Sequence, residues 1–139
     1  MIGIVIVAHG GLAREYLSAV EHVVGPQPGI RAVAIEDIHD RSLKQAEIRD
    51  AADEVDQGEG VVVVTDIFGG SPSNLSIPAC MMRDRVILYG ANLPMLVKLA
   101  KSRKLPLADA IAYAKEAGRK YINSYEVPAI LSAGGKAAS

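Results

Sequence analysis

The sequence predicts an α/β fold, a three-layer sandwich around a mainly parallel sheet with strand order 2-1-3-4. Short apolar runs, such as residues 4–8 and 60–65, are typical of strands buried on both faces of a parallel sheet. Segments with apolar residues at helical spacing alternate with these runs, which indicates parallel strands joined by right-handed helical crossovers. The length of 139 residues suits one domain with a substantial core.

Strands and helices are expected in alternation along the chain. The first strand ends near residue 8, and the later strands are expected at 30–36, 60–66 and 85–89. The helices are expected at 12–24, 41–55, 72–82, 92–102 and 107–121.

The segment after the last predicted helix is interpreted as one more strand. It carries apolar residues such as Val127, and it contains Pro128, which a strand tolerates only at an edge or a bulge. We therefore expect an antiparallel edge strand at about 125–131 that covers an open edge of the sheet. The domain then spans residues 1–131, and residues 132–139 form a flexible C-terminal tail.

Composition narrows the classes of protein that fit. Half of the residues are hydrophobic and 22% are charged, which excludes a disordered chain. No apolar stretch reaches the roughly 20 residues of a membrane helix, and the start of the chain lacks a basic n-region and a cleavage site. We therefore expect a cytoplasmic protein. The net charge of −1 gives no signal for binding nucleic acid.

Cysteine and histidine usage gives no indication of a metal centre. Cys80 is the only cysteine, which excludes an internal disulfide and a thiol-based zinc site. The acidic segment around His39 is interpreted as a solvated loop, and His22 is assigned no function. We expect neither a metal ion nor a cofactor.

His9 is the first candidate functional residue. It lies where the opening apolar strand gives way to Gly10 and Gly11. Its imidazole is therefore expected to emerge at the carboxyl end of a buried strand, where α/β sheets bind their ligands. A histidine at such a turn is by default a hydrogen-bonded structural residue, so the functional interpretation depends on a second motif.

That second motif follows the third predicted strand, which ends at Asp66. Gly69 and Gly70 permit positive φ and a close approach of the backbone to a ligand. Ser71 is a favoured N-cap, so a helix is expected to begin there with free N–H groups that favour a phosphate. By itself, this segment is interpreted as a capped helix after a glycine turn.

The predicted strand order brings the two motifs together. The first and third strands are neighbours, so His9 and Asp66 meet at the crevice where the strand order reverses. We expect Asp66 to hold the Nδ1–H of His9, which leaves Nε2 free as a nucleophile that forms phosphohistidine. The phosphoryl oxygens would then meet the amides of Gly70 and Ser71 and the Ser71 hydroxyl. Gly10, Phe68 and Asn92 are candidates for the rim, although capping the helix that follows is an alternative role for Asn92.

The phosphoryl donor is expected to be a carrier protein. The chain has no Walker A loop, and no dinucleotide glycine motif follows the first strand. A nucleotide bound to this chain is therefore not the expected source.

Three segments, Ala8-His9-Gly10, residues 65–74 and residues 90–96, together resemble a known family. This family is the IIA component of the mannose-type (mannose, fructose, sorbose) branch of the bacterial sugar phosphotransferase system. The three segments follow the family's order and span nearly the whole domain. The resemblance implies that His9 is phosphorylated and that Asp66 orients it. It also implies a phosphoryl pocket formed by Gly69, Gly70 and Ser71.

The resemblance also implies partners. A phosphotransferase of this family takes its phosphoryl group from the phosphocarrier protein HPr and passes it to a histidine of a IIB component. Many members are fused to that IIB domain, whereas this chain stops at Ser139, so we expect a separate IIB partner. The family further implies a homodimer, with exchange of the C-terminal strand, and contact with a membrane only through a IIC/IID permease. Phe68 departs from the tryptophan that members often carry, which leaves partner docking less defined.

Three other functions are weighed against this one. A stand-alone IIA component that signals through its phosphorylation state would use the same residues. A noncatalytic small-molecule-binding module would use the same crevice, with His9 only as a hydrogen-bonding group. A receiver domain needs an acidic pair after the first strand, where this chain has Ala8-His9-Gly10.

Overall fold

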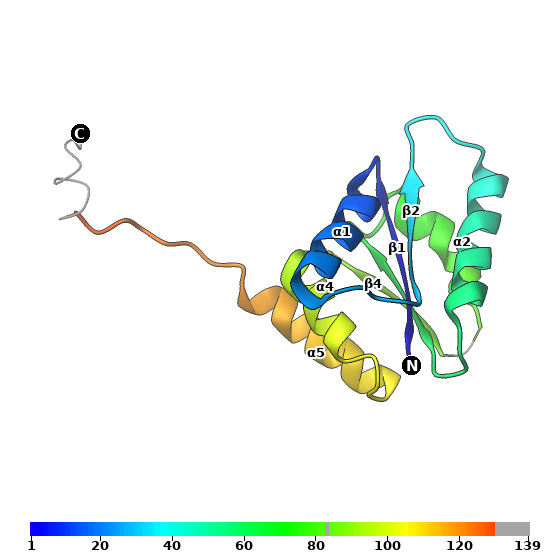
Figure 1. Ribbon diagram of the computed structural model, residues 1–139. Coiled ribbons are helices and arrows are strands. Elements are labelled where there is room, and N and C mark those ends of the chain that lie inside the picture. The colour runs from blue at the N-terminus through cyan, green and yellow to red at the C-terminus, as the bar shows by residue number, and fades with distance from the viewer. Residues whose placement is uncertain (83, 130–139) are drawn as a thin grey trace.

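The computed structural model describes residues 1–82 and 84–129, and these residues adopt the predicted α/β architecture (Figure 1). All strand pairs of its sheet are parallel, in the order β2-β1-β3-β4, which confirms the predicted 2-1-3-4. The strands are β1 (Gly3–His9), β2 (Ile30–Ile35), β3 (Val61–Thr65) and β4 (Arg85–Tyr89). The two central strands, β1 and β3, are buried along almost their whole length.

Helices cover both faces of the sheet (Figure 1). One face packs against α1 (Leu12–Val24), α4 (Leu93–Lys101) and α5 (Leu107–Lys120). The other face packs against α2 (Arg41–Val55), α3 (Ser71–Ser76) and the 3₁₀ helix η1 (Ile77–Cys80). Alternate β1 residues point to opposite faces, so Ile4 and Ile6 enter one core layer while Val5 and Val7 enter the other. This alternation explains why β1 has no polar residue before His9.

The helix predicted over residues 72–82 is wrong in part. The α-helix ends at Ser76, and a 3₁₀ turn continues to Cys80. Pro78 lies in that turn and lacks the N–H that an α-helix would direct to the carbonyl four residues earlier. The tighter 3₁₀ turn is therefore the conformation that this sequence takes.

The C-terminal segment forms no strand with the chain's own sheet within the described residues. Residues 122–128 are extended and exposed, and Figure 1 shows them leading away from the body of the domain. The predicted edge strand at 125–131 therefore stays a prediction. Its last two residues and the predicted tail at 132–139 lie outside the described residues.

Among the residues that the structure describes, no helix combines the length and the apolar character that crossing a bilayer requires.

Candidate active site

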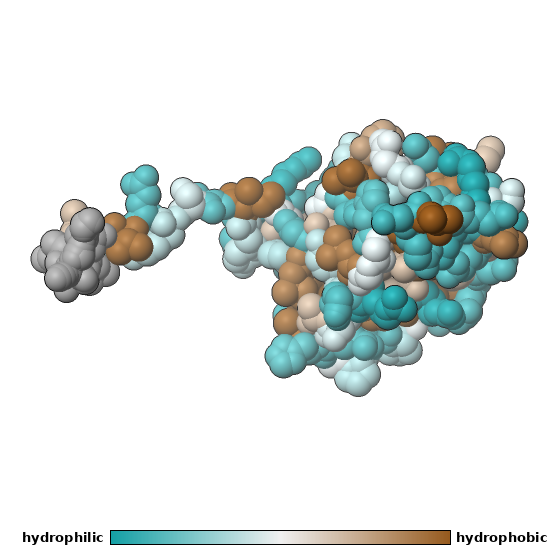
Figure 2. Space-filling model, turned by 90° about the horizontal axis from the view of Figure 1, so that it is seen from above, coloured by the Kyte–Doolittle hydropathy of each residue, from teal (hydrophilic) through white to brown (hydrophobic). Residues whose placement is uncertain are grey.

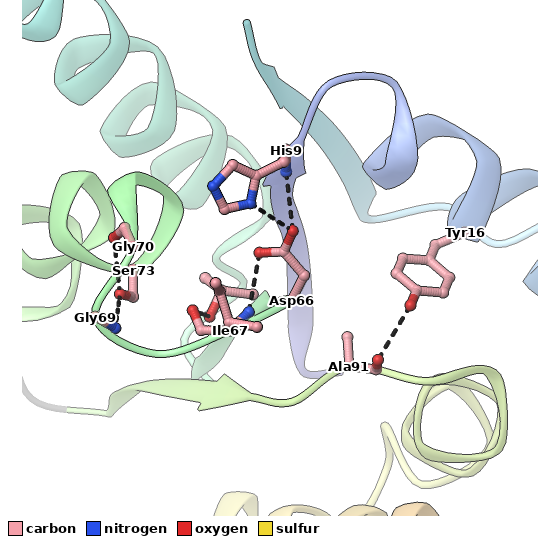
Figure 3. A network of polar contacts seen from close by, with 9 residues as sticks. His9, Tyr16, Asp66, Ile67, Gly69, Gly70, Ser73 and Ala91 are labelled. Atoms are coloured by element: carbon pink, nitrogen blue, oxygen red, sulfur yellow. Dashed lines mark hydrogen bonds and ion pairs between the residues drawn. The ribbon is translucent and has the colours of Figure 1, made fainter. Parts of the chain in front are cut away.

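His9 and Asp66 lie together at the carboxyl edge of the sheet (Figure 3). His9 is the last residue of β1, and Asp66 directly follows β3, the strand paired with β1. One carboxylate oxygen, Asp66 Oδ2, accepts the backbone N–H of His9 at 3.1 Å and lies 2.8 Å from Nδ1 of the ring. The imidazole is thus held at Nδ1, and Nε2 lies on the opposite side of the ring.

The environment of Asp66 keeps its carboxyl group ionised. Partial burial opposes ionisation, but hydrogen bonds from the His9 ring, the His9 backbone and the Ile67 N–H outweigh burial and lower the pKa of Asp66. Because an ionised carboxylate only accepts hydrogen bonds, Nδ1 of His9 carries the shared proton. The neutral tautomer of His9 therefore presents an unprotonated Nε2.

The glycine turn after Asp66 lies against this imidazole. Gly69 has a φ of +93°, a conformation that side-chain-bearing residues rarely adopt. A Cβ atom at Gly70 would lie 3.3 Å from Cε1 of His9, so the absence of a side chain lets the backbone approach the ring. The first glycine is required for backbone conformation and the second for space.

The prediction of Ser71 as N-cap is wrong by one residue. Gly70 is the N-cap of α3, and Ser71 is the first helical residue. The cap makes no side-chain hydrogen bond, because glycine has no side chain with which to make one. Ser71 N–H is among the first amides of the helix, which have no partner within the helix.

Ser73 is a residue that the sequence analysis missed. Its hydroxyl accepts the Gly69 N–H at 2.8 Å and donates to the Gly70 carbonyl at 3.0 Å (Figure 3). These two bonds fix both glycines of the turn. A serine three residues after a glycine pair is the only signal that the sequence offers for this contact.

The three expected rim residues have different environments. Gly10 forms the turn after β1 with a φ of +57°, and its N–H donates to the Ile35 carbonyl at 2.9 Å. Phe68 is 61% exposed, and its ring centroid lies 4.7 Å from that of Tyr89. Both rings are therefore available at the surface near the glycine turn.

Asn92 takes the capping role. Its Oδ1 accepts the Met95 N–H at 3.0 Å at the start of α4, and its Nδ2 donates to the Gly118 carbonyl at 2.9 Å. Both ends of the amide are used to tie α4 to α5. The structure therefore does not bring Asn92 into a polar contact with His9 or Asp66.

The remaining histidines and the cysteine lie elsewhere. His22 is exposed on α1, and the His39 ring lies 2.8 Å from the Glu36 carbonyl in the loop after β2. Among the residues that the structure describes, no group of three His, Cys, Asp or Glu side chains is placed to hold a metal ion. Burial raises the pKa of the Cys80 thiol to about 11, which makes it a packed, protonated thiol.

This geometry supports nucleophilic chemistry at a histidine. The imidazole is oriented, has a free Nε2 and carries an ionised carboxylate on its other nitrogen. The first amides of α3, which have no partner within the helix, lie in the adjacent segment. Groups of these kinds can accept and bind a phosphoryl group. The His9 side chain is 50% exposed, so a large partner can reach it.

Comparison with known proteins gives an independent result. A family model, EIIA-man, described as "PTS system fructose IIA component" (PTS, phosphotransferase system), matches residues 3–115. The PTS mannose-specific EIIAB component of Escherichia coli K12 is 26% identical over 144 residues, covering 95% of this chain and 42% of the relative. The chain thus spans less than half the length of that relative. YadI of the same organism, an inferred phosphotransferase enzyme IIA component, is 30% identical over 105 residues, covering 75% of this chain and 72% of YadI.

Solved structures share the fold. The PTS component EIIA from Streptococcus agalactiae has a TM-score of 0.80 at 25% identity, covering 89% of this chain and 97% of that one. The mannose/sorbose-specific IIA subunit from Enterococcus faecalis has a TM-score of 0.81 at 23% identity, covering 91% of this chain and 96% of that one. The family match spans both strands of the His9–Asp66 site and every helix around it except the end of α5. The chain belongs to the EIIA-man family of IIA components of the phosphotransferase system.

Proposed function

We propose that this chain is a phosphoryl carrier that accepts a phosphoryl group on Nε2 of His9. The donor is the phosphocarrier protein HPr, and the acceptor is a histidine of a IIB component. The observation that carries the proposal is the 2.8 Å contact between Asp66 and Nδ1 of His9, which leaves Nε2 as the free nitrogen.

The transfer step follows from this arrangement. Nε2 of His9 attacks the phosphorus, a P–N bond forms, and the bond between phosphorus and the donor atom breaks with its electron pair returning to the donor. The imidazole gains positive charge as the new bond forms. The Asp66 carboxylate stabilises that charge through the Nδ1–H. Transfer to IIB is the same step with His9 as the leaving group.

The glycine turn supplies the proposed phosphoryl-binding groups. Gly70 lies close enough to His9 that an added Cβ would crowd Cε1, so a group on the ring would lie over this turn. The amides of Gly70 and Ser71 and the Ser71 hydroxyl are the proposed donors. Gly69 contributes by shaping the turn, because its N–H donates to the Ser73 hydroxyl.

Exposed apolar side chains around the site support a protein as the donor. Ile38, Ile67 and Phe68 are 92%, 56% and 61% exposed and lie in loops at the carboxyl edge of the sheet. Figure 2 views the molecule from this end and shows brown apolar patches among polar ones. Exposed apolar groups that surround a reactive side chain are typical of a protein-docking surface. We expect the complex to form in the cytoplasm and to reach a membrane only through a IIC/IID permease.

The test uses HPr carrying a labelled phosphoryl group. The wild type is expected to take up acid-labile label, and His9→Gln is expected to take up none. His22→Gln, which replaces another exposed histidine, is the control and is expected to label like the wild type. Equal labelling of wild type and His9→Gln would overturn the assignment. No labelling of the wild type would favour the small-molecule-binding alternative.

We also infer a homodimer in which the C-terminal strand of one subunit covers β4 of the other. A groove of about 380 Å³ lies between the β4 edge and α5, lined by residues that include Val86, Leu88 and Ile122. Val127 and Tyr125, in the extended segment that follows, are 57% and 79% exposed and would bury apolar surface there.

Two truncations test the dimer and the domain boundary together. Removing everything after Ser124 is expected to give a less stable monomer in sedimentation at several concentrations. Removing only residues 132–139 is expected to leave the dimer intact. A dimer that survives the longer truncation would refute the exchange.

A further inference from the structure

Tyr16 connects two segments that flank the site. It lies in the second turn of α1, and its hydroxyl donates to the Ala91 carbonyl at 3.1 Å. Ala91 lies in the loop after β4, and its own N–H donates to the Thr65 carbonyl at 3.1 Å. Thr65 is fully buried and directly precedes Asp66. The Tyr16 hydroxyl is therefore linked, through Ala91, to the carbonyl of the peptide bond that joins Thr65 to Asp66.

These contacts form a closed loop of covalent and hydrogen bonds, and Figure 3 shows two of its links, Tyr16 to Ala91 and Asp66 to His9. The covalent chain runs from His9 to Tyr16, hydrogen bonds lead through Ala91 to Thr65, and Asp66 returns to His9 through its carboxylate. The hydroxyl bond of Tyr16 joins segments 75 residues apart in the sequence and is the link that ties α1 to this closed loop.

The hydroxyl stays a hydrogen-bond donor throughout the physiological pH range. Burial, and then the negative charge of Asp66, raise the pKa of Tyr16 above its ordinary value of 10.0.

We propose that Tyr16 is a positioning residue for phosphoryl transfer, because its bond to Ala91 holds the start of α1 and the backbone of Asp66 at a fixed separation. This keeps the His9 ring oriented with Nε2 toward the phosphoryl group. The inference rests on the proposed function of His9, and it assigns Tyr16 no contact with substrate.

The test compares Tyr16→Phe with the wild type. Loss of one hydrogen bond is expected to lower kcat of transfer from HPr about two- to tenfold, with the KM for HPr unchanged. The ¹⁵N signals of the His9 imidazole, which report tautomer and ring environment, are expected to shift in the variant. Tyr113→Phe is the matched control, because Tyr113 is half-exposed on α5 and makes no side-chain hydrogen bond with the described residues.

Three outcomes distinguish the possibilities. A slower transfer together with shifted His9 signals supports the positioning role. An unchanged kcat and unchanged His9 signals, even with a lower melting temperature, would overturn it and leave Tyr16 a residue of stability alone. A wild type that takes no label would instead refute the proposed function of His9.

Discussion

Each end of the sheet carries a nitrogen-bearing side chain held by carboxylates, and these two side chains differ in burial. At the carboxyl end, His9 is 50% exposed beside Asp66. At the amino end, Arg85 is 2% exposed and donates to Asp53 at 2.8 Å and Asp56 at 3.0 Å. The Arg85 side chain also donates to the Ala79 carbonyl at 3.1 Å.

This difference in burial separates the roles of the two pairs. Arg85 has most of its donors satisfied inside the protein, where an unpaired charge would be costly. The His9 pair uses only one ring nitrogen and leaves the other at the surface. The buried Arg85 is suited to stability, and the half-exposed His9 is suited to chemistry.

The largest expected effect comes from removing the buried guanidinium. Arg85→Met is expected to lower the free energy of unfolding by about 3 kcal/mol, because it removes two hydrogen bonds to carboxylates and one to the Ala79 carbonyl. Phosphoryl transfer by the folded protein is expected to stay at the wild-type rate. Urea unfolding and labelling from HPr measure the two quantities. A large loss of transfer in protein that is still folded would contradict the separation of roles.

Asp66→Asn is the corresponding change at the exposed pair. The amide keeps the shape of the carboxylate but brings no charge and favours the wrong tautomer of His9, so transfer is expected to fall about 100-fold. Stability is expected to change by less than about 1 kcal/mol, because the partner His9 is half-exposed. Rapid-quench kinetics in both directions measure the effect, and unchanged rates would show that Asp66 is only structural.

Gly70→Ala is expected to have a smaller effect at the same site. The added Cβ would lie 3.3 Å from Cε1 of His9 and displace the ring, which is expected to slow transfer about tenfold. Gly11→Ala is the matched control, since a Cβ there meets no atom of the described residues within 4 Å and φ is −89°. Equal rates for the two variants would contradict the close fit of Gly70 against the ring.

The smallest expected effect is the acid dependence of stability. The pKa of Asp56 is lowered by the Gly58 N–H and then by Arg85, and the pKa of Asp66 is lowered as described above. Both carboxyls therefore stabilise the fold fully above their unfolded pKa of about 3.9 and lose that contribution as pH falls through the lower folded value. Urea midpoints from pH 6 to pH 2.5 are expected to fall less steeply in Arg85→Met than in the wild type. Parallel profiles would show that Arg85 does not act through Asp56.

Much of this fold could be predicted from the sequence because its signals are local. The bounds of α1 and α2 agree with the apolar spacing of their residues, and β1 and β3 have no polar residue before their last position. The change from α3 to a 3₁₀ turn was missed because it depends on the missing N–H of Pro78, which the apolar pattern of residues 72–82 does not express.

The contacts of the site likewise differ in how far the sequence could predict them. The contact between His9 and Asp66 follows from strand order, which places two strand ends side by side. The contacts of Ser73 and Tyr16 depend on how side chains meet across a loop or between distant segments. A tyrosine among the apolar residues of α1 is indistinguishable, by spacing alone, from an ordinary core residue.

The half-exposed imidazole of His9 has a consequence for the lifetime of the phosphorylated protein. A phosphoryl group on Nε2 would be open to bulk water for as long as the surface is uncovered, so hydrolysis competes with delivery. Water is excluded only while a partner is docked over the ring. The fraction of phosphoryl groups delivered then depends on the rate of binding to the acceptor relative to the rate of hydrolysis. A higher acceptor concentration raises that fraction.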